Sequence, residues 1–343
     1  MPVEVKTMES GDEARWDAFV HSAPDATFFH RSGWARVIRE VFGHPVEYLL
    51  AERAGQVVGV LPLARIRSWL FGDALISTPF CVYGGVVAAD DEAREALDQA
   101  AQQRAGALGV GHLEYRHREP LHDDWPRKDD LYATFRKPIG TDEEENLRAI
   151  PRKQRRMVRQ GMKAGLEAAW ETDLDRFYDI YARSVHRLGT PVFPRRYFRS
   201  LADTFGDDCR VLTVCLDGKP ITSVLTFYFR DEVLPYYGGG VPEAREVAGY
   251  DFLYWELMRR AGEAGYRLFD FGRSKRDTGA YHFKRNWGFE PQPLSYEYCL
   301  YKRREVPQNN PLNPRYQRAI RIWQRLPLAV ANRIGPMVVR NLG

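Results

Sequence analysis

An internal repeat is the sequence feature that most constrains how this chain can fold. The stretch Glu52–Val60 has a counterpart in Leu216–Val224, and each contains a glycine turn followed by an apolar run. A Tyr-Gly-Gly triplet follows each stretch, at Tyr83–Gly85 and at Tyr237–Gly239. Each half then continues with a segment ending near a glycine and an apolar stretch that holds an acidic residue. Matches in the same order predict two similar units.

The apolar pattern predicts the same order of elements in both halves: two helices, a hairpin, a strand, a helix and a strand. Trp34, Val37, Ile38 and Val41 recur at the spacing of a buried helix face. We expect helices at 12–20, 31–42, 91–108, 174–188, 194–205, 250–264 and 278–287. We expect strands at 46–51, 56–66, 75–77, 81–87, 112–116, 131–136, 209–216, 221–230, 233–237, 267–271 and 294–302. This order predicts an α/β (α+β) fold with mixed, twisted sheets flanked by helices.

The length of 343 residues suits two ordinary domains. We place the N-terminal domain at 1–140 and the C-terminal domain at 141–303, with a basic linker helix at 146–164. A basic amphipathic tail follows at 304–343.

The composition is that of a globular protein, with 44% hydrophobic and 28% charged residues. The net charge of +4 is too small to indicate a nucleic-acid-binding protein on its own. The four cysteines have neither zinc nor redox spacing, so we expect buried thiols in a reducing compartment and no metal site. Residues 1–12 lack a secretory pattern, and no run reaches the ~18 apolar residues of a membrane span. We therefore expect a cytoplasmic protein.

The second half holds the most specific motifs. They are Tyr237-Gly238-Gly239, Asp270-Phe271-Gly272-Arg273, Gly279-x-Tyr281-x-Phe283-Lys284 with Trp287-Gly288-Phe289, and the basic run Arg152–Lys163. This set resembles the FemAB peptidyltransferase family, also described as BioF2-like or FemAB-like acyltransferases of the GNAT superfamily. The resemblance covers most of the chain and is strong from about 150 to 301. It implies tandem GNAT-like domains. The ending, Leu326 to Pro336, is similar to a subgroup found with exosortase and exopolysaccharide systems.

Lys284 is the residue that we expect to carry the chemistry. In the family that the chain resembles, the Phe-Lys pair ends the acceptor channel, here Phe283 and Lys284. Attack of an amine on an ester or thioester creates an oxyanion, which a fixed cation stabilises. A lysine partly desolvated beside Phe283 and Trp287 could alternatively transfer a proton.

Asp270 and Arg273 follow an apolar strand, at the place where α/β proteins hold ligands. Asp270 could accept the proton of the incoming amine, and Arg273 could position a substrate. The alternative is a structural Asp–Arg pair. The substrate-binding residues that the resemblance adds are Tyr237, Gly238, Tyr281, Phe283, Tyr83 and Arg39. The site would lie in the cleft between the halves.

The basic run gives two interpretations of Arg152, Arg155, Arg156 and Arg159. They form either a solvated helix face or a phosphate contact, on a nucleotide-linked precursor or on a tRNA. We expect no tightly bound cofactor and a donor that is either aminoacyl-tRNA or acyl-CoA. The segment Arg245–Gly249 lacks the regular pyrophosphate loop of acetyl-CoA enzymes, and Glu246 would repel phosphate, which argues against simple acetyl-CoA chemistry.

The tail pairs Ile320, Ile322 and Leu326 with a series of arginines. It either contacts a membrane surface peripherally or packs back on the N-terminal domain.

The sequence thus predicts an acyl or aminoacyl transferase that forms an amide on an amino group of a cell-envelope or exopolysaccharide precursor. The acceptor would be a small, lipid-linked or nucleotide-linked sugar or peptide. One alternative is an acetyl-CoA-dependent N-acetyltransferase acting on an amino sugar. Another is a non-catalytic scaffold of polysaccharide assembly.

Overall fold

The computed structural model describes residues 1–68, 72–307 and 314–342, and the chain forms two compact units. The first unit contains the described residues of 1–132, 293–309 and 340–343. The second contains those of 133–292 and 310–339. Each unit is therefore built from separate stretches of the chain.

The first unit is built on an eight-stranded sheet with the order β1-β2-β3-β4-β6-β16-β7, and β5 pairs with β3. Only β4 and β6 are parallel neighbours among the described strands of this sheet. The strands are β1 (Glu4–Thr7), β2 (Val46–Arg53), β3 (Gln56–Ser68), β4 (Gly72–Ser77), β5 (Val87–Ala88), β6 (His112–His117), β7 (Arg127–Lys128) and β16 (Ser295–Leu300).

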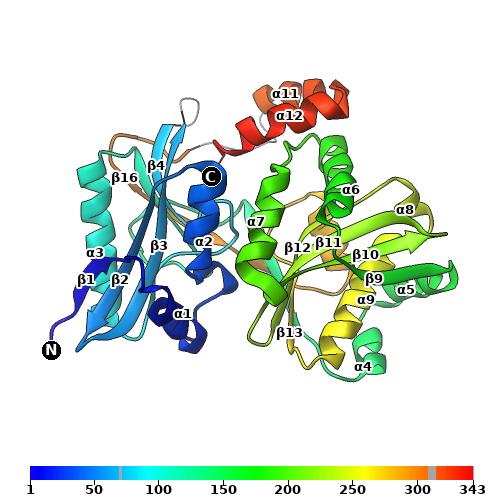
Figure 1. The fold of residues 1–343 in the computed structure, drawn as a ribbon, viewed down its shortest axis with the longest axis horizontal. Coiled ribbons are helices and arrows are strands. Elements are labelled where there is room, and N and C mark those ends of the chain that lie inside the picture. Colours follow the sequence, from blue (N-terminus) through cyan, green and yellow to red (C-terminus); the bar gives the residue numbers. More distant parts are fainter. Residues whose placement is uncertain (69–71, 308–313, 343) are drawn as a thin grey trace. The chain divides into compact units, whose positions relative to one another are not determined.

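Helices cover both faces of this sheet, α3 on one and α1 with α2 on the other (Figure 1). Leu97 of α3 belongs to the core cluster that contains Leu49 and Leu61, whereas Trp16 of α1 stacks on Tyr48 at 5.1 Å between ring centroids. The helical elements are α1 (Glu13–Ser22), η1 (Phe28–His30), α2 (Gly33–Val37), a π-helical turn η2 (Ile38–Phe42) and α3 (Asp91–Leu108).

The second unit has a sheet of the same design, with the order β14-β8-β13-β12-β11-β10-β9 and β15 beside β8. Strands β9 to β12 are antiparallel and β12 runs parallel to β13. The strands are β8 (Tyr132–Pro138), β9 (Leu166–Glu171), β10 (Cys209–Leu216), β11 (Lys219–Phe229), β12 (Glu232–Gly240), β13 (Leu268–Asp270), β14 (Ser274–Lys275) and β15 (Pro291–Pro293).

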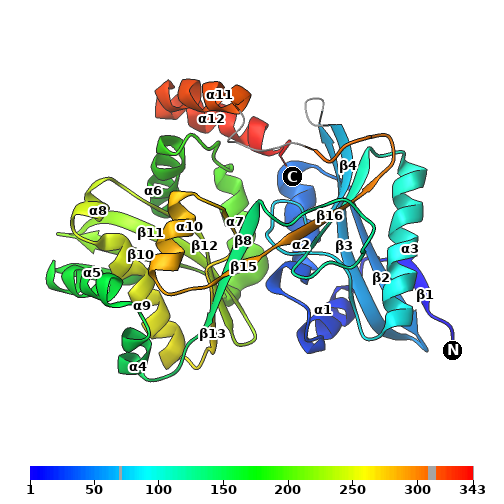
Figure 2. The same cartoon turned by 180° about the vertical axis from the view of Figure 1, so that it is seen from behind.

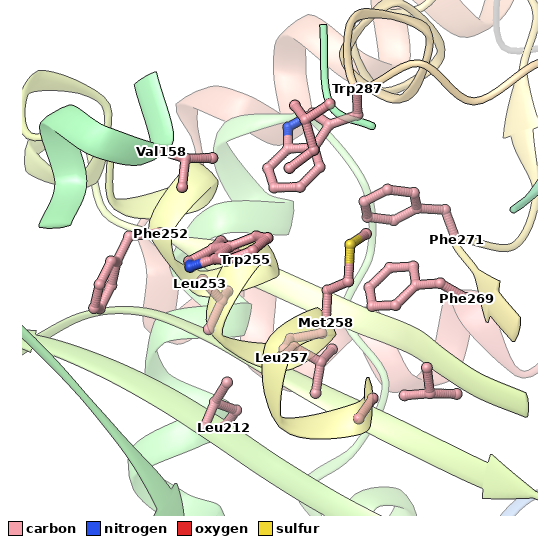
Figure 3. Close-up of a cluster of buried hydrophobic side chains, with 14 of the residues drawn as sticks. Val158, Leu212, Phe252, Leu253, Trp255, Leu257, Met258, Phe269, Phe271 and Trp287 are labelled. Carbon is pink, nitrogen blue, oxygen red and sulfur yellow. The ribbon is translucent and has the colours of Figure 1, made fainter. Parts of the chain in front are cut away.

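Its helices are α4 (Glu143–Arg148), α5 (Arg152–Lys163), α6 (Leu174–Arg187), α7 (Arg195–Phe205), η3 (Gly206–Asp208), α8 (Glu243–Glu246), α9 (Gly249–Glu263), α10 (Gly279–Asn286), α11 (Pro314–Arg325) and α12 (Leu328–Val339). Figure 2 shows the elements of this unit from the back of Figure 1. Leu253, Trp255 and Leu257 of α9 pack with Leu212 of β10, and Trp287 closes the same core from the end of α10 (Figure 3). This dense aromatic core holds α9 and α10 in fixed positions.

The predicted duplication is confirmed at the level of the fold. The order β1-β2-β3-β4-β6 in one sheet matches β9-β10-β11-β12-β13 in the other, and both contain one parallel pair at the same place. The predicted mixed sheets flanked by helices are also confirmed.

The predicted domain boundaries at 140 and 303 are wrong, because the two units exchange strands. Strand β8, expected in the first domain, pairs with β13 of the second sheet, with Asp270 opposite Arg136. Strand β16, expected in the second domain, pairs with β6 of the first sheet, with Tyr298 opposite Glu114. Each connection therefore continues past its own unit to complete the edge of the other sheet.

The predicted strand at 81–87 is also wrong, since only Val87–Ala88 forms a strand, β5. The preceding segment is a loop in which Thr78 and Phe80 have φ values of 39° and 71°. Such left-handed residues interrupt a strand.

The four cysteines are free thiols. Cys81 and Cys209 are buried, whereas Cys215 and Cys299 are partly buried.

The predicted tail forms the helices α11 and α12, while its residues 308–313 and 343 lie outside the described residues. Residues 314–339, which include both helices, belong to the second unit, so the expectation that the tail packs on the N-terminal domain is wrong for α11 and α12. It holds for Arg340, which belongs to the first unit and has its carbonyl oxygen 2.8 Å from His44 Nε2. His186 Nε2 of α6 lies 3.1 Å from the Trp323 carbonyl oxygen, and Gln324 donates to the Arg187 carbonyl at 2.9 Å.

Candidate active site

The second unit contains a cavity of about 640 Å³. Five elements contribute to its wall: the end of α6, the end of β12, α8, the start of α9, and α10 with the residues before it. The lining residues are Ser184, Arg187, Leu188, Gly238, Gly239, Ala244, Arg245, Ala248, Tyr250, Asp251, Tyr254, Phe271, Thr278, Gly279, Ala280, Phe283 and Lys284. Its size is within the range of small-molecule sites.

The glycines at the end of β12 allow tyrosines of α9 to approach the strand. A Cβ added to Gly238 would lie 2.9 Å from the Tyr254 hydroxyl oxygen, and one added to Gly240 would lie 2.7 Å from that of Tyr250. A Cβ added to Gly239 would lie 2.8 Å from the Cβ of Ser184 in α6. Real Cβ atoms do not tolerate such contacts, so close approach of α9 and α6 accounts for both glycines of the Tyr-Gly-Gly triplet in the second half.

Lys284 reaches the cavity wall from α10 and is 9% exposed. Its Nζ donates to three consecutive carbonyl oxygens, those of Phe271 at 2.7 Å, Gly272 at 2.9 Å and Arg273 at 3.2 Å. Burial lowers the pKa of Lys284 to about 7, against the opposing charge of Asp270, while Arg273 lowers it further. Near neutral pH this side chain can therefore act either as a cation or as a proton acceptor.

Asp270 is fully buried at the end of β13 and is not among the lining residues. Its Oδ1 accepts from the Gly272 amide at 2.7 Å and from the Thr134 hydroxyl at 3.3 Å, and its Oδ2 lies 3.3 Å from Arg136 Nε. These contacts hold the turn whose carbonyls receive Lys284. Asp270 is thus placed to position Lys284 rather than to touch a substrate in this cavity. The half-buried Arg273 contributes its carbonyl to the same turn.

The other predicted residues of the second half divide into two groups. Gly238 and Phe283 line the cavity. Tyr237 instead bonds the Tyr197 hydroxyl at 2.8 Å in an aromatic cluster, and Tyr281 packs edge-on against Phe135 at 5.3 Å between centroids. These two tyrosines support the wall from behind.

The predicted phosphate-binding arginines lie on α5 and do not line the cavity. Arg152, Arg156 and Arg159 are exposed, while Arg155 donates to two carbonyls of the segment before α5 at 3.3 Å. The opposite face of α5 packs on α9, where Gln154 is buried. Arg152, Arg156 and Arg159 thus face solvent outside the cavity wall.

Tyr83 and Arg39 belong to the first unit and are not among the residues that line the cavity. Tyr83 is buried, with its ring 5.9 Å from that of Phe29, and Arg39 is exposed.

Sequence reasoning missed Asp251, which lines the cavity from the first turn of α9 and is 7% exposed. Its Oδ1 accepts from the Trp287 indole nitrogen at 3.1 Å and from the Gln154 side-chain amide. Burial raises the pKa of Asp251. The available signal was its i, i+3 spacing to Tyr254, since Asp251 is the one charged residue in the otherwise uncharged stretch from Gly249 to Trp255.

The segment before α9 differs from what its sequence indicates. Arg245 and Ala248 line the cavity, whereas Glu246 is exposed and is not part of the lining. Ala248 has a φ of 56° and precedes the first residue of α9, so the amino end of this helix lies at the cavity. Helix amino ends attract anions. The argument from Glu246 against a phosphate at this place is therefore not supported by the structure.

In the part of the chain that the structure describes, no group of three or more His, Cys, Asp or Glu side chains could hold a metal ion. Nor does any described helix combine the length and apolar character needed to cross a membrane.

Comparison with known proteins agrees with this geometry. Residues 146–285 match the family model described as Acetyltransferase (GNAT) domain, which covers every lining residue of the cavity. No curated protein sequence matches the chain.

Solved structures share the fold over nearly the whole chain. The crystal structure of FemX is 17% identical, with a TM-score of 0.69, over 87% of this chain and 98% of that one. The C-terminal domain of a putative lysylphosphatidylglycerol synthetase from Agrobacterium fabrum is 14% identical, with a TM-score of 0.57, over 84% of this chain and 91% of that one. A tandem GNAT protein from the clavulanic acid biosynthesis pathway is 15% identical, with a TM-score of 0.53, over 87% of this chain and 98% of that one.

These likenesses establish a tandem GNAT-like, FemAB-like fold. Together with the matched domain, they support the general activity of an N-acyltransferase.

Proposed function

We propose that the second unit transfers an acyl or aminoacyl group to an amino group of a cell-envelope or exopolysaccharide precursor. The observation that carries the proposal is the buried amine of Lys284 in the wall of a cavity within the matched GNAT domain. The likeness to FemX and to the lysylphosphatidylglycerol synthetase domain supports acyl or aminoacyl transfer, and similarity to the exosortase-associated subgroup stays part of the proposal.

In the proposed reaction, the acceptor nitrogen attacks the carbonyl carbon of the donor. The C–N bond forms, the carbonyl oxygen becomes an oxyanion, and collapse of the tetrahedral carbon breaks the bond to the leaving oxygen or sulfur. A preorganised cation in a dry site stabilises such an oxyanion far more than one in water does.

The contacts of Lys284 limit how this stabilisation works. Its three ammonium protons can all be engaged by the three carbonyls, so a direct bond to the oxyanion must replace one of them. The contact with the Arg273 carbonyl, at 3.2 Å, is the longest and the easiest to replace. Without such an exchange, the ammonium acts on the oxyanion through its charge alone.

The donor in this proposal is aminoacyl-tRNA or acyl-CoA, and neither is held as a tight cofactor. The amino end of α9 and the two arginines of the lining, Arg187 and Arg245, offer an anion-binding side to the cavity. The exposed arginines Arg152, Arg156 and Arg159 would contact phosphates farther along a tRNA or a nucleotide-linked precursor.

The test is incubation of the purified protein with radiolabelled aminoacyl-tRNA and acyl-CoA pools, together with a cell extract as the source of acceptor. We expect label from one pool to enter an amide product that resists hydroxylamine. Consumption of neither pool would contradict the proposal.

A second candidate is an acetyl-CoA-dependent N-acetyltransferase acting on an amino sugar. It is favoured by the position of Arg245 and the amino end of α9 at the cavity, where a pyrophosphate could bind. Protection of the protein by CoA against thermal unfolding would support it. The third candidate, a non-catalytic scaffold, would require that Lys284→Ala leave the function in cells unchanged.

Peripheral contact with the inner face of the cytoplasmic membrane is the last part of the proposal. Ile322 of α11 is 64% exposed and Met337 of α12 is 70% exposed. Arg318, Arg321, Arg325 and Arg333 are also exposed, and no acidic residue follows Glu305. Exposed apolar side chains among arginines suit an anionic lipid surface.

A further inference from the structure

Helix α9 brings two side-chain oxygens to the cavity that make no hydrogen bond to another described residue. Asp251 and Tyr254 are one helical turn apart and both line the cavity. The Oδ2 of Asp251 makes no hydrogen bond to another described residue, because the contacts from Gln154 and Trp287 both reach Oδ1. The Tyr254 hydroxyl likewise bonds no described residue.

The position of Asp251 is fixed from two sides. Gln154 belongs to α5 and Trp287 follows α10, and the two donors orient the carboxyl group so that one oxygen remains for the cavity. A buried carboxylate oxygen that receives no hydrogen bond from another residue costs free energy. A cationic hydrogen-bond donor would satisfy that oxygen.

The charges of the lining indicate which substrate group this oxygen receives. Asp251 is the one acidic residue in the lining, while Arg187, Arg245 and Lys284 are basic. Anionic parts of either substrate are therefore attracted to the basic residues, and a cationic part is attracted to Asp251. The rings of Tyr250, Tyr254, Phe271 and Phe283 would exclude water around it.

We propose that Asp251 Oδ2 and the Tyr254 hydroxyl bind the ammonium group of the acceptor, and that Asp251 accepts the proton which this group loses before attack. The inference rests on the proposed function and assigns the residues that bind and deprotonate its acceptor amine. The raised pKa of Asp251 is consistent with this role, since a more basic carboxylate accepts a proton more readily.

Proton transfer from the ammonium group to Asp251 precedes formation of the amide bond. One N–H bond of the ammonium breaks and its proton passes to Oδ2, which leaves a neutral amine with a free electron pair. That pair forms the new C–N bond, and the bond from the acyl carbon to its oxygen or sulfur leaving group breaks. A second proton from the nitrogen ends on the leaving group, and Asp251 returns its proton to solvent.

The binding half of the inference can be tested without knowing the substrate. The probes are 2-phenylethylamine and 2-phenylethanol, which differ in the ammonium group and suit an aromatic cavity. Their dissociation constants are measured by titration calorimetry at neutral pH. A charge-assisted hydrogen bond contributes about 1.5–3 kcal/mol, so the wild type should bind the amine about tenfold or more tightly than the alcohol.

Three variants complete the test. Asp251→Asn should abolish the preference for the amine. Tyr254→Phe, which removes a hydroxyl that bonds none of the described residues, should reduce it. Glu263→Gln at the far end of α9, an exposed carboxylate that pairs with Arg259, should keep it. A wild type without preference, or a preference that survives in Asp251→Asn and Tyr254→Phe, would overturn the inference.

Failure of the inference and failure of the proposed function give different results. If the wild type transfers label and Asp251→Asn transfers it at the same rate, the proposed function stands and the role of Asp251 is refuted. If the amine preference depends on Asp251 but no donor is consumed, the ammonium site stands and acyl transfer is refuted.

Discussion

The lowered pKa of Lys284 has a measurable consequence for stability. A shift from 10.5 to about 7 corresponds to about 5 kcal/mol between the two protonation states. Between these two values the unfolded chain binds more protons at this residue than the folded one, so stability rises with pH across the window. Below pH 7 the lysine is protonated in both states, and the cost of burying its charge is present in full.

Lys284→Met removes the titrating group and keeps an unbranched side chain. We expect the difference in unfolding free energy, wild type minus variant, to increase by about 3 kcal/mol between about pH 7 and about pH 9.5. Urea unfolding followed by tryptophan fluorescence measures it, with Lys153→Met on the exposed face of α5 as the control. A difference that stays flat would show that Lys284 keeps its proton throughout, which refutes the lowered pKa and the proton-acceptor role.

Three further predictions concern the His122–Asp98 pair, the contact of Gly238 with Tyr254, and the exposed side chains of α11 and α12. His122 bonds Asp98, and its pKa is raised to about 9 despite burial. His122→Gln should therefore lower the unfolding free energy below about pH 6.5, and this loss should disappear as the pH rises through 9. Urea unfolding at a series of pH values measures it. Gly238→Ala should destabilise the protein by about 1–3 kcal/mol through the contact with Tyr254, and Tyr254→Phe should restore part of that loss in thermal unfolding. The wild type should sediment with phosphatidylglycerol vesicles but not with phosphatidylcholine vesicles. The double variant Ile322→Asp, Met337→Asp should not sediment with either. Equal sedimentation of the wild type and the double variant with phosphatidylglycerol vesicles would refute the membrane contact.

Local chemistry accounts for the parts of the fold that were predictable from sequence. Asp217 and Gly218 adopt φ values of 49° and 74°, the left-handed pair that a two-residue hairpin needs. The apolar spacing likewise placed α3, α6 and α9 to within two residues. Such signals act over a few residues and need no knowledge of the partner segment.

The exchange of β8 and β16 could not be predicted in the same way. An apolar strand pattern indicates burial but not which sheet edge the strand joins, and both edges here offer equivalent places. Asp251 was missed for a related reason. Its burial depends on Gln154 and Trp287, which are distant in sequence and meet it only in the folded chain.

The two units have sheets of the same design but differ in the segment that forms the cavity wall. In the second unit the segment between β13 and β15 contains α10, which carries Lys284. In the first unit the described residues between β6 and β7 form no helix, and Leu121 and His122 there donate backbone amides to buried Glu297. This difference concentrates the proposed chemistry in the second unit.

The most direct measurement compares the rate of amide formation in Lys284→Met with that in the wild type and in Lys137→Met. Lys137 is the control, because it is half-buried and, like Lys284, donates to a backbone carbonyl, that of Ala149 at 2.7 Å. Loss of a fixed charge aimed at an oxyanion costs about 10²–10³ in kcat, so we expect that loss in Lys284→Met and a rate near the wild type in Lys137→Met. Equal rates in all three proteins would contradict the assignment of Lys284 to acyl transfer.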